Sequence, residues 1–173
     1  DNEAIKQDLA IHGLALFDYF DIKYVTLHKE LTSLNREARI TQLMSEILNE
    51  NIPIYEDNKM VVYKIPKPNS LEPFLLLGSG WHTYVECEPD EEGLNCYARV
   101  TMKNSEILII NPTESTIDIT LGIVLKSILD EKTLTISFNN EKLDVLDVPI
   151  TRTAMHVENL ILVPGVNVVT LHT

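Results

Sequence analysis

The apolar positions in the N-terminal part of the chain follow two different spacings. Over residues 2–19 and again over residues 34–49, apolar side chains recur every three or four positions, which predicts two amphipathic helices. Thr32 and Ser33 stand just before the second run, and either is a suitable helix N-cap. Residues 22–28 (IKYVTLH) are β-branched and aromatic, which predicts a strand between the helices.

Two further β-rich runs follow, over residues 52–55 and 60–65, and the polar residues 56–59 between them are typical of a hairpin turn. Residues 66–70 (PKPNS) have linker composition, because their prolines lack the amide hydrogen that a central strand needs. We therefore expect a small α/β module with the order α-β-α-β-β over residues 1–66, followed by a second module over residues 67–173.

The second module shows a different pattern of short apolar runs separated by turn residues. Asn139 and Asn140 form one such turn, and Pro164 and Gly165 form another. The candidate strands are residues 81–87, 96–102, 107–110, 116–125, 133–138, 142–148, 157–162 and 167–171. Short strands at intervals of about 8–12 residues predict an antiparallel sandwich or jelly roll, because a parallel sheet needs helices between its strands. The predicted fold class is α+β, with a small α/β module before an all-β, jelly-roll-like sandwich.

Composition and charge exclude several classes of protein. The 173 residues are 45% hydrophobic and 23% charged, which is ordinary for a globular chain. With 14 basic and 26 acidic residues the net charge is −12, so nucleic acid and anionic membrane surfaces would be repelled. Apolar runs are too short to span a bilayer, which needs about 18 such residues or more, and we recognise no signal peptide. Nucleic acid is therefore not an expected partner.

The two cysteines, Cys87 and Cys96, stand at the facing ends of two adjacent predicted strands. Strict alternation places Cys87 on one face with Trp81, and Cys96 on the matching face of its neighbour. If the register sets them opposite each other, a cross-strand disulfide is feasible and would fit an oxidising, extracytoplasmic location. Two buried thiols are the alternative. A zinc site is not expected, because there is no second pair of cysteines.

The other face of the same predicted hairpin combines polar and aromatic side chains. The candidate ligand-binding residues there are His82, Tyr84, Glu86, Tyr97 and Arg99. Aromatic rings beside groups that form paired hydrogen bonds suit carbohydrates, which present apolar C–H faces and rows of hydroxyls. The alternative is a solvated outer face with cross-strand pairs such as Glu86 with Arg99.

Residue patterns for catalysis or metal binding are missing from the sequence. The acidic run from Glu86 to Glu92 lacks the residue order of a calcium loop, so we predict neither a metal nor a cofactor. Residues 78–81 (GSGW) are not a nucleophile elbow, and we interpret them as a flexible lead-in to the next strand. A hydrolase using Glu86 and Asp90 is a weaker hypothesis, because carboxylates on the rim of one exposed loop rarely acquire the raised pKa of an acid catalyst. We predict no catalytic residue.

Two groups of segments resemble a known family. The first group is residues 20–28 (FDIKYVTLH) and, after a helix, residues 54–65 (IYEDNKMVVYKI). The second group is Gly80-Trp81, Glu86, Arg99-Val100, Ile110-Asn111-Pro112, Leu134-Thr135-Ile136, Asn139 and Pro164-Gly165-Val166-Asn167. Together they resemble the soluble C-terminal extracytoplasmic region of polytopic membrane glycosyltransferase-like proteins of the lipid-phosphosugar-dependent type, many of which end in a β-sandwich.

The resemblance implies a non-catalytic accessory domain, tethered to the cell membrane through transmembrane segments that this sequence does not contain. The catalytic residues of that family lie in its membrane portion, so none is transferred to this chain, and the chain alone is not expected to be an enzyme. The implied partners are the membrane-embedded portion of the same parent chain and a glycan or glycolipid acceptor. The alternative is a structural or protein-interaction module that binds no sugar.

Overall fold

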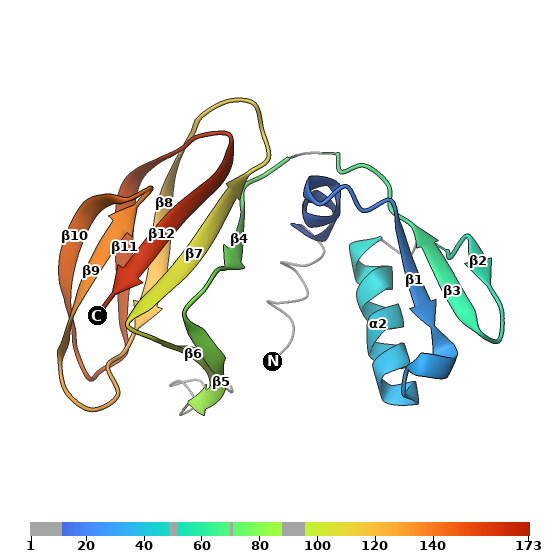
Figure 1. Ribbon diagram of the computed structural model, residues 1–173, viewed down its shortest axis with the longest axis horizontal. Helices are drawn as coiled ribbons and strands as arrows, with labels where there is room; N and C mark the ends of the chain where they lie inside the picture. The colour runs from blue at the N-terminus through green and yellow to red at the C-terminus, as the bar shows by residue number, and fades with distance from the viewer. Residues whose placement is uncertain (1–11, 49–51, 70, 88–95) are drawn as a thin grey trace. The chain divides into compact units, whose positions relative to one another are not determined.

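The computed structural model describes residues 12–48, 52–69, 71–87 and 96–173 (Figure 1). In these residues the chain is mostly β, with two helices and several antiparallel sheets. It divides into two compact units, Asp1–Glu72 and Pro73–Thr173. The division falls after residue 72, whereas the proline-rich segment had placed the predicted boundary at residue 66.

The first unit contains both helices and a three-stranded sheet. Its elements are a helix over residues 12–19, β1 (Tyr24–His28), the 3₁₀ turn η1 (Lys29–Leu31), α2 (Leu34–Ile47), β2 (Tyr55–Glu56) and β3 (Met60–Lys64). The strand order is β1-β3-β2, with every pair antiparallel. Ser33 occupies the N-cap position of α2 in an extended conformation, although its side chain makes no capping hydrogen bond. Residues 2–11 of the first predicted helix lie outside the described residues.

The core of the first unit lies between α2 and the sheet. Alternate residues of β3, Val61 and Tyr63, are buried with Leu27 of β1, and Met44 and Ile47 cover them from α2. Alternation along a strand and a spacing of three along a helix produce these two apolar faces.

The helix over residues 12–19 also approaches α2 closely. A Cβ added at Gly13 would lie 2.9 Å from the Ile47 side chain. Glycine at this position therefore permits the close approach, although it weakens the helix itself.

The second unit consists of antiparallel strands. They are β4 (Phe74–Leu77), β5 (Trp81–Cys87), β6 (Cys96–Thr101), β7 (Asn104–Asn111), β8 (Ile117–Leu125), β9 (Lys132–Phe138), β10 (Glu141–Val148), β11 (Thr153–Leu162) and β12 (Gly165–His172). A five-stranded sheet has the order β10-β9-β12-β7-β4, and β8 with β11 and β5 with β6 form two two-stranded sheets. Each predicted strand of this unit is present, with bounds shifted by a few residues, and β4 was not predicted.

The core of the second unit takes side chains from two of these sheets. Buried residues of the five-stranded sheet contact buried residues of the β8–β11 pair in one cluster. The first group is Ile107, Ile109, Leu134, Ile136, Val148, Val169 and Leu171, and the second is Leu121, Leu160 and Leu162.

Asparagine and glycine residues set the turns of this unit. Asn139 and Asn140 have φ of 49° and 71° and close the hairpin from β9 to β10, as their sequence predicts. Gly165 begins β12 with φ of 91°. Asn159, with φ of 58°, lies in an irregularity of β11 between Val157 and Leu160.

β4 and β7 pair directly with each other, although 26 residues separate them in the sequence. Leu77 is opposite Ile107, and Phe74 is opposite Ile110. The chain therefore leaves the five-stranded sheet after β4, forms the β5–β6 hairpin and returns as β7 (Figure 1).

Candidate functional site

The base of the β5–β6 hairpin is hydrogen-bonded to the start of β7. The Gly78 amide donates to the Glu106 carbonyl oxygen and the Glu106 amide donates to the Ser79 carbonyl oxygen, both at 2.9 Å. The Ser79 hydroxyl also donates to Glu106 Oε2 at 2.9 Å. The segment over residues 78–81, which we interpreted as a flexible lead-in, is thus hydrogen-bonded to β7. The Ser79 hydroxyl bonds to the Glu106 carboxylate, and this bond holds the hairpin base to β7.

Gly80 occupies a position that other residues do not fit. Its φ is +82°, and an added Cβ would lie 1.7 Å from the Asn104 carbonyl oxygen. The Gly80 carbonyl oxygen accepts hydrogen bonds from the Met102 amide, at 2.9 Å, and from the hydroxyl of the fully buried Ser105. The two ends of the hairpin therefore meet at a single backbone carbonyl.

Trp81 anchors the first residue of β5. Its Nε1–H donates to the Glu106 carbonyl oxygen at 2.6 Å, and its half-buried ring packs against the core of the second unit. Hydrogen bonding of the indole N–H is typical for a tryptophan that is partly removed from water. The ring therefore joins the hairpin to the core.

The register of the β5–β6 ladder differs from strict alternation at its base. Trp81 is opposite Thr101 and Tyr84 is opposite Arg99, so the register shifts between Trp81 and Tyr84. The strict alternation that we expected from Trp81 to Cys87 is therefore interrupted, because β5 contains one residue more than β6 over this stretch. Thr101, the residue opposite Trp81, is two residues after Arg99 in β6. By alternation, Thr101 and Arg99 lie on the same face of that strand.

Beyond this shift, the register brings four of the five predicted ligand-binding positions into two adjacent cross-strand pairs. Tyr84 is opposite Arg99, and Glu86 is opposite Tyr97. In this register Glu86 and Arg99 are diagonal neighbours, and the suggested cross-strand pair between them stays a prediction. His82 is exposed, and the half-buried Arg99 donates from Nη1 to the His82 carbonyl oxygen at 3.1 Å.

The same ladder sets Cys87 directly opposite Cys96. This is the register that the predicted disulfide needs, and the disulfide itself stays a prediction. Residues 88–95, which include Asp90 and most of the acidic run, lie outside the described residues.

Hydrogen bonds and charges shift several pKa values in the first unit. One group of these residues lies at the β2–β3 turn. Asp57 accepts hydrogen bonds from the Tyr55 hydroxyl at 2.6 Å and from the amides of Lys59 and Met60. These bonds, that of Tyr55 first, lower the pKa of Asp57, while the Asp57 carboxylate raises the pKa of Tyr55. The arrangement pins an exposed turn and offers no acid–base pair in a cleft.

Lys29 joins the same turn to η1. Its Nζ donates to Glu56 Oε1 at 2.8 Å and to the Asp57 carbonyl oxygen at 2.9 Å. The hydrogen bond to Glu56 raises the pKa of Lys29. Away from this turn, Lys23 pairs with Asp21, which raises the pKa of Lys23 and lowers that of Asp21.

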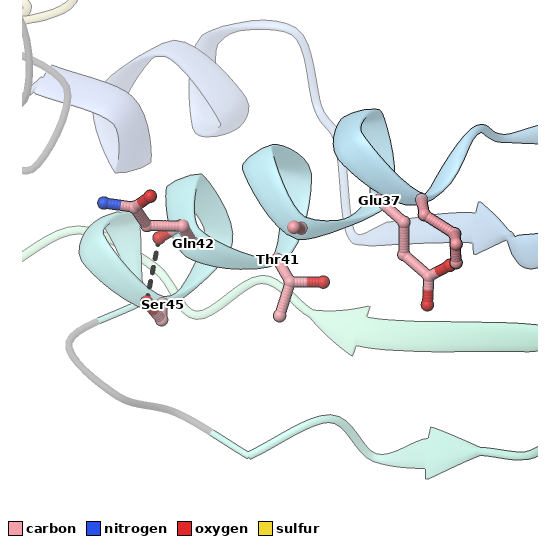
Figure 2. Close-up of a pocket in the computed structure, with 6 residues that line it drawn as sticks. Glu37, Thr41, Gln42 and Ser45 are labelled. Atoms are coloured by element: carbon pink, nitrogen blue, oxygen red, sulfur yellow. Dashed lines mark hydrogen bonds between the residues drawn. The ribbon is translucent and has the colours of Figure 1, made fainter.

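A shallow depression runs along one side of α2 (Figure 2). It is lined by Leu34, Glu37, Ala38, Thr41, Gln42 and Ser45, all from this one helix. The Ser45 hydroxyl donates to the Gln42 carbonyl oxygen at 2.8 Å, and the Gln42 side chain donates to Glu46. Both bonds stay within α2, and the residues that line the depression include no nucleophile beside a base.

The part of the chain that the structure describes shows neither a metal-binding cluster nor a membrane-spanning helix. There, no three His, Cys, Asp or Glu side chains lie close enough together to hold a metal ion. No helix in the described ranges is long and apolar enough to cross a membrane.

Sequence reasoning did not identify the residues that position the hairpin. Ser105 and Glu106 are polar residues before an apolar run, which gave no sign that they begin a strand or bind residues 78–81.

Comparison with protein-family models, with curated proteins and with solved structures finds no match to the chain.

Proposed function

We propose that the second unit is a β-sandwich and that the first is an α/β module of the order α-β-α-β-β. The sandwich is supported by the shared core, in which side chains of the five-stranded sheet pack against those of β8 and β11. The β5–β6 hairpin then extends from one edge of the sandwich at the junction with β7. The proposed architecture is that of a compact scaffold that carries one protruding binding element.

We further propose that the chain is a non-catalytic, extracytoplasmic accessory domain of a membrane-embedded glycosyltransferase-like protein, and that the hairpin contacts a glycan or a glycolipid acceptor. The observation that carries this proposal is the register of β5 and β6. It sets Tyr84 opposite Arg99 and Glu86 opposite Tyr97, so two tyrosines and two charged residues occupy one block of neighbouring positions. Directly opposed residues have Cβ atoms about 4.5–5.5 Å apart, a scale comparable with one sugar ring.

The anchoring of the hairpin also supports the proposal. A binding element that is fixed before the ligand arrives loses less conformational entropy on binding than a mobile one. Trp81, Ser79 and Gly80 each bond to the first residues of β7, and these bonds hold the hairpin base against the core.

Glycan binding is tested with the purified chain on a glycan array, followed by calorimetry with any sugar that is retained. We expect Tyr84→Ala and Tyr97→Ala each to weaken binding by about tenfold or more, because each removes a ring on which a sugar face stacks. Tyr24→Ala is the matched control, since Tyr24 is a strand tyrosine with an exposed side chain and belongs to the first unit.

The outcomes separate the two functions that the sequence left open. Sugar binding that is lost in the two hairpin variants and kept in Tyr24→Ala supports the proposal. The proposal is contradicted if the folded chain binds no glycan on the array, or if all three variants lose sugar binding equally. The chain would then be better described as an interaction module without sugar binding.

A further inference from the structure

A group of exposed aliphatic side chains lies on two loops of the second unit. Ile128 and Leu129, between β8 and β9, are 71% and 87% exposed, and Ile150, between β10 and β11, is 53% exposed. We name these three residues the aliphatic tip. Single exposed apolar residues are common, but three large ones on adjoining loops form a patch.

The pairing of the strands brings the two loops to the same end of the unit. The last residue of β8, Leu125, is opposite the first residue of β11, Thr153. The first residue of β9, Lys132, is likewise opposite the last residue of β10, Val148. Both loops therefore leave the strands at one end.

Hydrogen bonds fasten these loops to each other. The Ser127 amide donates to the Pro149 carbonyl oxygen at 2.8 Å, which links the two loops. The buried Ser127 hydroxyl donates to the Asp130 carbonyl oxygen and closes the first loop around Ile128 and Leu129. The exposed leucine and isoleucine are thus presented by a closed turn.

The charges around the aliphatic tip differ from those of the chain as a whole. Lys126, Lys132 and Arg152 are exposed beside it, and Asp130 and Glu131 are the acidic residues of the same loops. Lys132 pairs with Asp130 at 2.9 Å. Three cations against two anions contrast with the 14 basic and 26 acidic residues of the whole chain.

We propose that the aliphatic tip inserts into the surface of a phospholipid bilayer, with the cationic side chains of Lys126 and Arg152 at the level of the lipid phosphates. Aliphatic side chains at the ends of loops gain free energy in the fluid interior of a bilayer, which adapts to their shape. Long basic side chains at the same level extend toward phosphate while their methylene stems stay in apolar surroundings.

The net charge of the chain decides which lipid surface suits the aliphatic tip. A charge of −12 opposes approach to an anionic membrane, so burial of the aliphatic side chains must supply the attraction. A zwitterionic phosphatidylcholine surface is therefore the expected ligand. The inference concerns residues outside the β5–β6 hairpin and does not rest on the proposed glycan contact.

The test is sedimentation of the full chain with sucrose-loaded phosphatidylcholine vesicles over a range of lipid concentrations. We expect Ile128→Ser/Leu129→Ser to lower the partition coefficient by about tenfold or more, because it removes two apolar side chains from the inserted tip. The matched control is Leu31→Ser/Leu34→Ser, since both leucines are 84% exposed but lie in the first unit. Unfolding in urea, followed by circular dichroism so that both units are observed, should show that neither double variant loses stability.

A second measurement places the tip in the lipid. In Leu129→Trp, the added indole should shift its emission to shorter wavelength when vesicles are present, while the wild-type spectrum of Trp81 stays the same. No sedimentation of the wild type, or an equal loss in both double variants, would overturn the proposal. It would also be overturned if the wild type self-associates without binding vesicles and only Ile128→Ser/Leu129→Ser becomes monomeric, since the tip would then be a contact between copies of the chain.

Discussion

Gly80 offers a sharp test of how the β5–β6 hairpin is fixed, because a second glycine provides a matched comparison. Gly80 and Gly165 have similar φ angles of +82° and +91°. An added Cβ would lie 1.7 Å from the Asn104 carbonyl oxygen at Gly80, and it would meet nothing within 4 Å at Gly165. The two alanine substitutions therefore share the cost of positive φ and differ in the collision.

The expected magnitudes follow from the contacts at each glycine. Alanine at positive φ costs about 1–2 kcal/mol, and a stiffer unfolded chain returns about 0.4–1 kcal/mol of this, so Gly165→Ala should lose about 1 kcal/mol. In Gly80→Ala the start of β7 must also move away, which breaks the bonds from Met102 and the buried Ser105 to the Gly80 carbonyl oxygen. Two lost hydrogen bonds and a buried hydroxyl left without its partner add about 2–4 kcal/mol.

The assay is equilibrium unfolding in urea, monitored by the fluorescence of Trp81. Trp81 is the single tryptophan of the chain and stands beside Gly80, so its emission reports on the second unit. Gly80→Ala should be about 2–4 kcal/mol less stable than Gly165→Ala at an unchanged denaturant slope. If the two variants agree within about 1 kcal/mol, a difference smaller than the loss of one buried bond, our account of the close approach to Asn104 is refuted.

Three further predictions concern other parts of the chain. Asn167 is fully buried, and its Oδ1 and Nδ2 bond to neighbouring turns, so Asn167→Ala should lose about 2–4 kcal/mol in the same urea assay; a loss below about 1 kcal/mol would contradict this. Hydrogen bonds, that of Tyr55 first, lower the pKa of Asp57 in the folded chain. The Asp57 carboxylate therefore stabilises the fold fully at a pH above the ordinary aspartate pKa of about 3.9. This stability is lost as the pH falls through the lower pKa of the folded chain. Circular dichroism should therefore show that urea unfolding of Asp57→Asn changes less than that of the wild type between pH 5 and pH 3, and parallel curves would count against the assignment. Alkylation of the unfolded chain should label Cys87 and Cys96 only after reduction, as read by mass; two labels without reductant would show that they are free thiols.

The strands of the second unit could be predicted because their apolar runs and turn residues are local signals. Asn139 and Asn140 mark a tight turn wherever they stand between two such runs, and the structure confirms it. β4 was missed because its sequence, FLLL, has no alternation and directly follows Pro73. It forms a strand because β7 pairs with it, and the sequence of either segment alone does not predict that pairing.

The predicted site illustrates the same limit. The residues of the hairpin could be named from alternation, but one additional residue near Trp81 changes which positions lie opposite one another. Such a bulge depends on the fit of Trp81 and Gly80 to β7, and these contacts join segments about 25 residues apart. Pairing across that distance was beyond what periodicity in the sequence describes.

The direct pairing of β4 with β7 has a consequence for how this protein can vary. Because these strands close on each other at Leu77 and Ile107, the five-stranded sheet is complete without β5 and β6, although Trp81 of β5 packs against its core. The intervening residues behave as an insertion in a β4–β7 hairpin, and doubling the length of such a loop costs only about 0.6 kcal/mol. The chain can therefore accept a longer, shorter or different hairpin at this position while it keeps the five-stranded sheet.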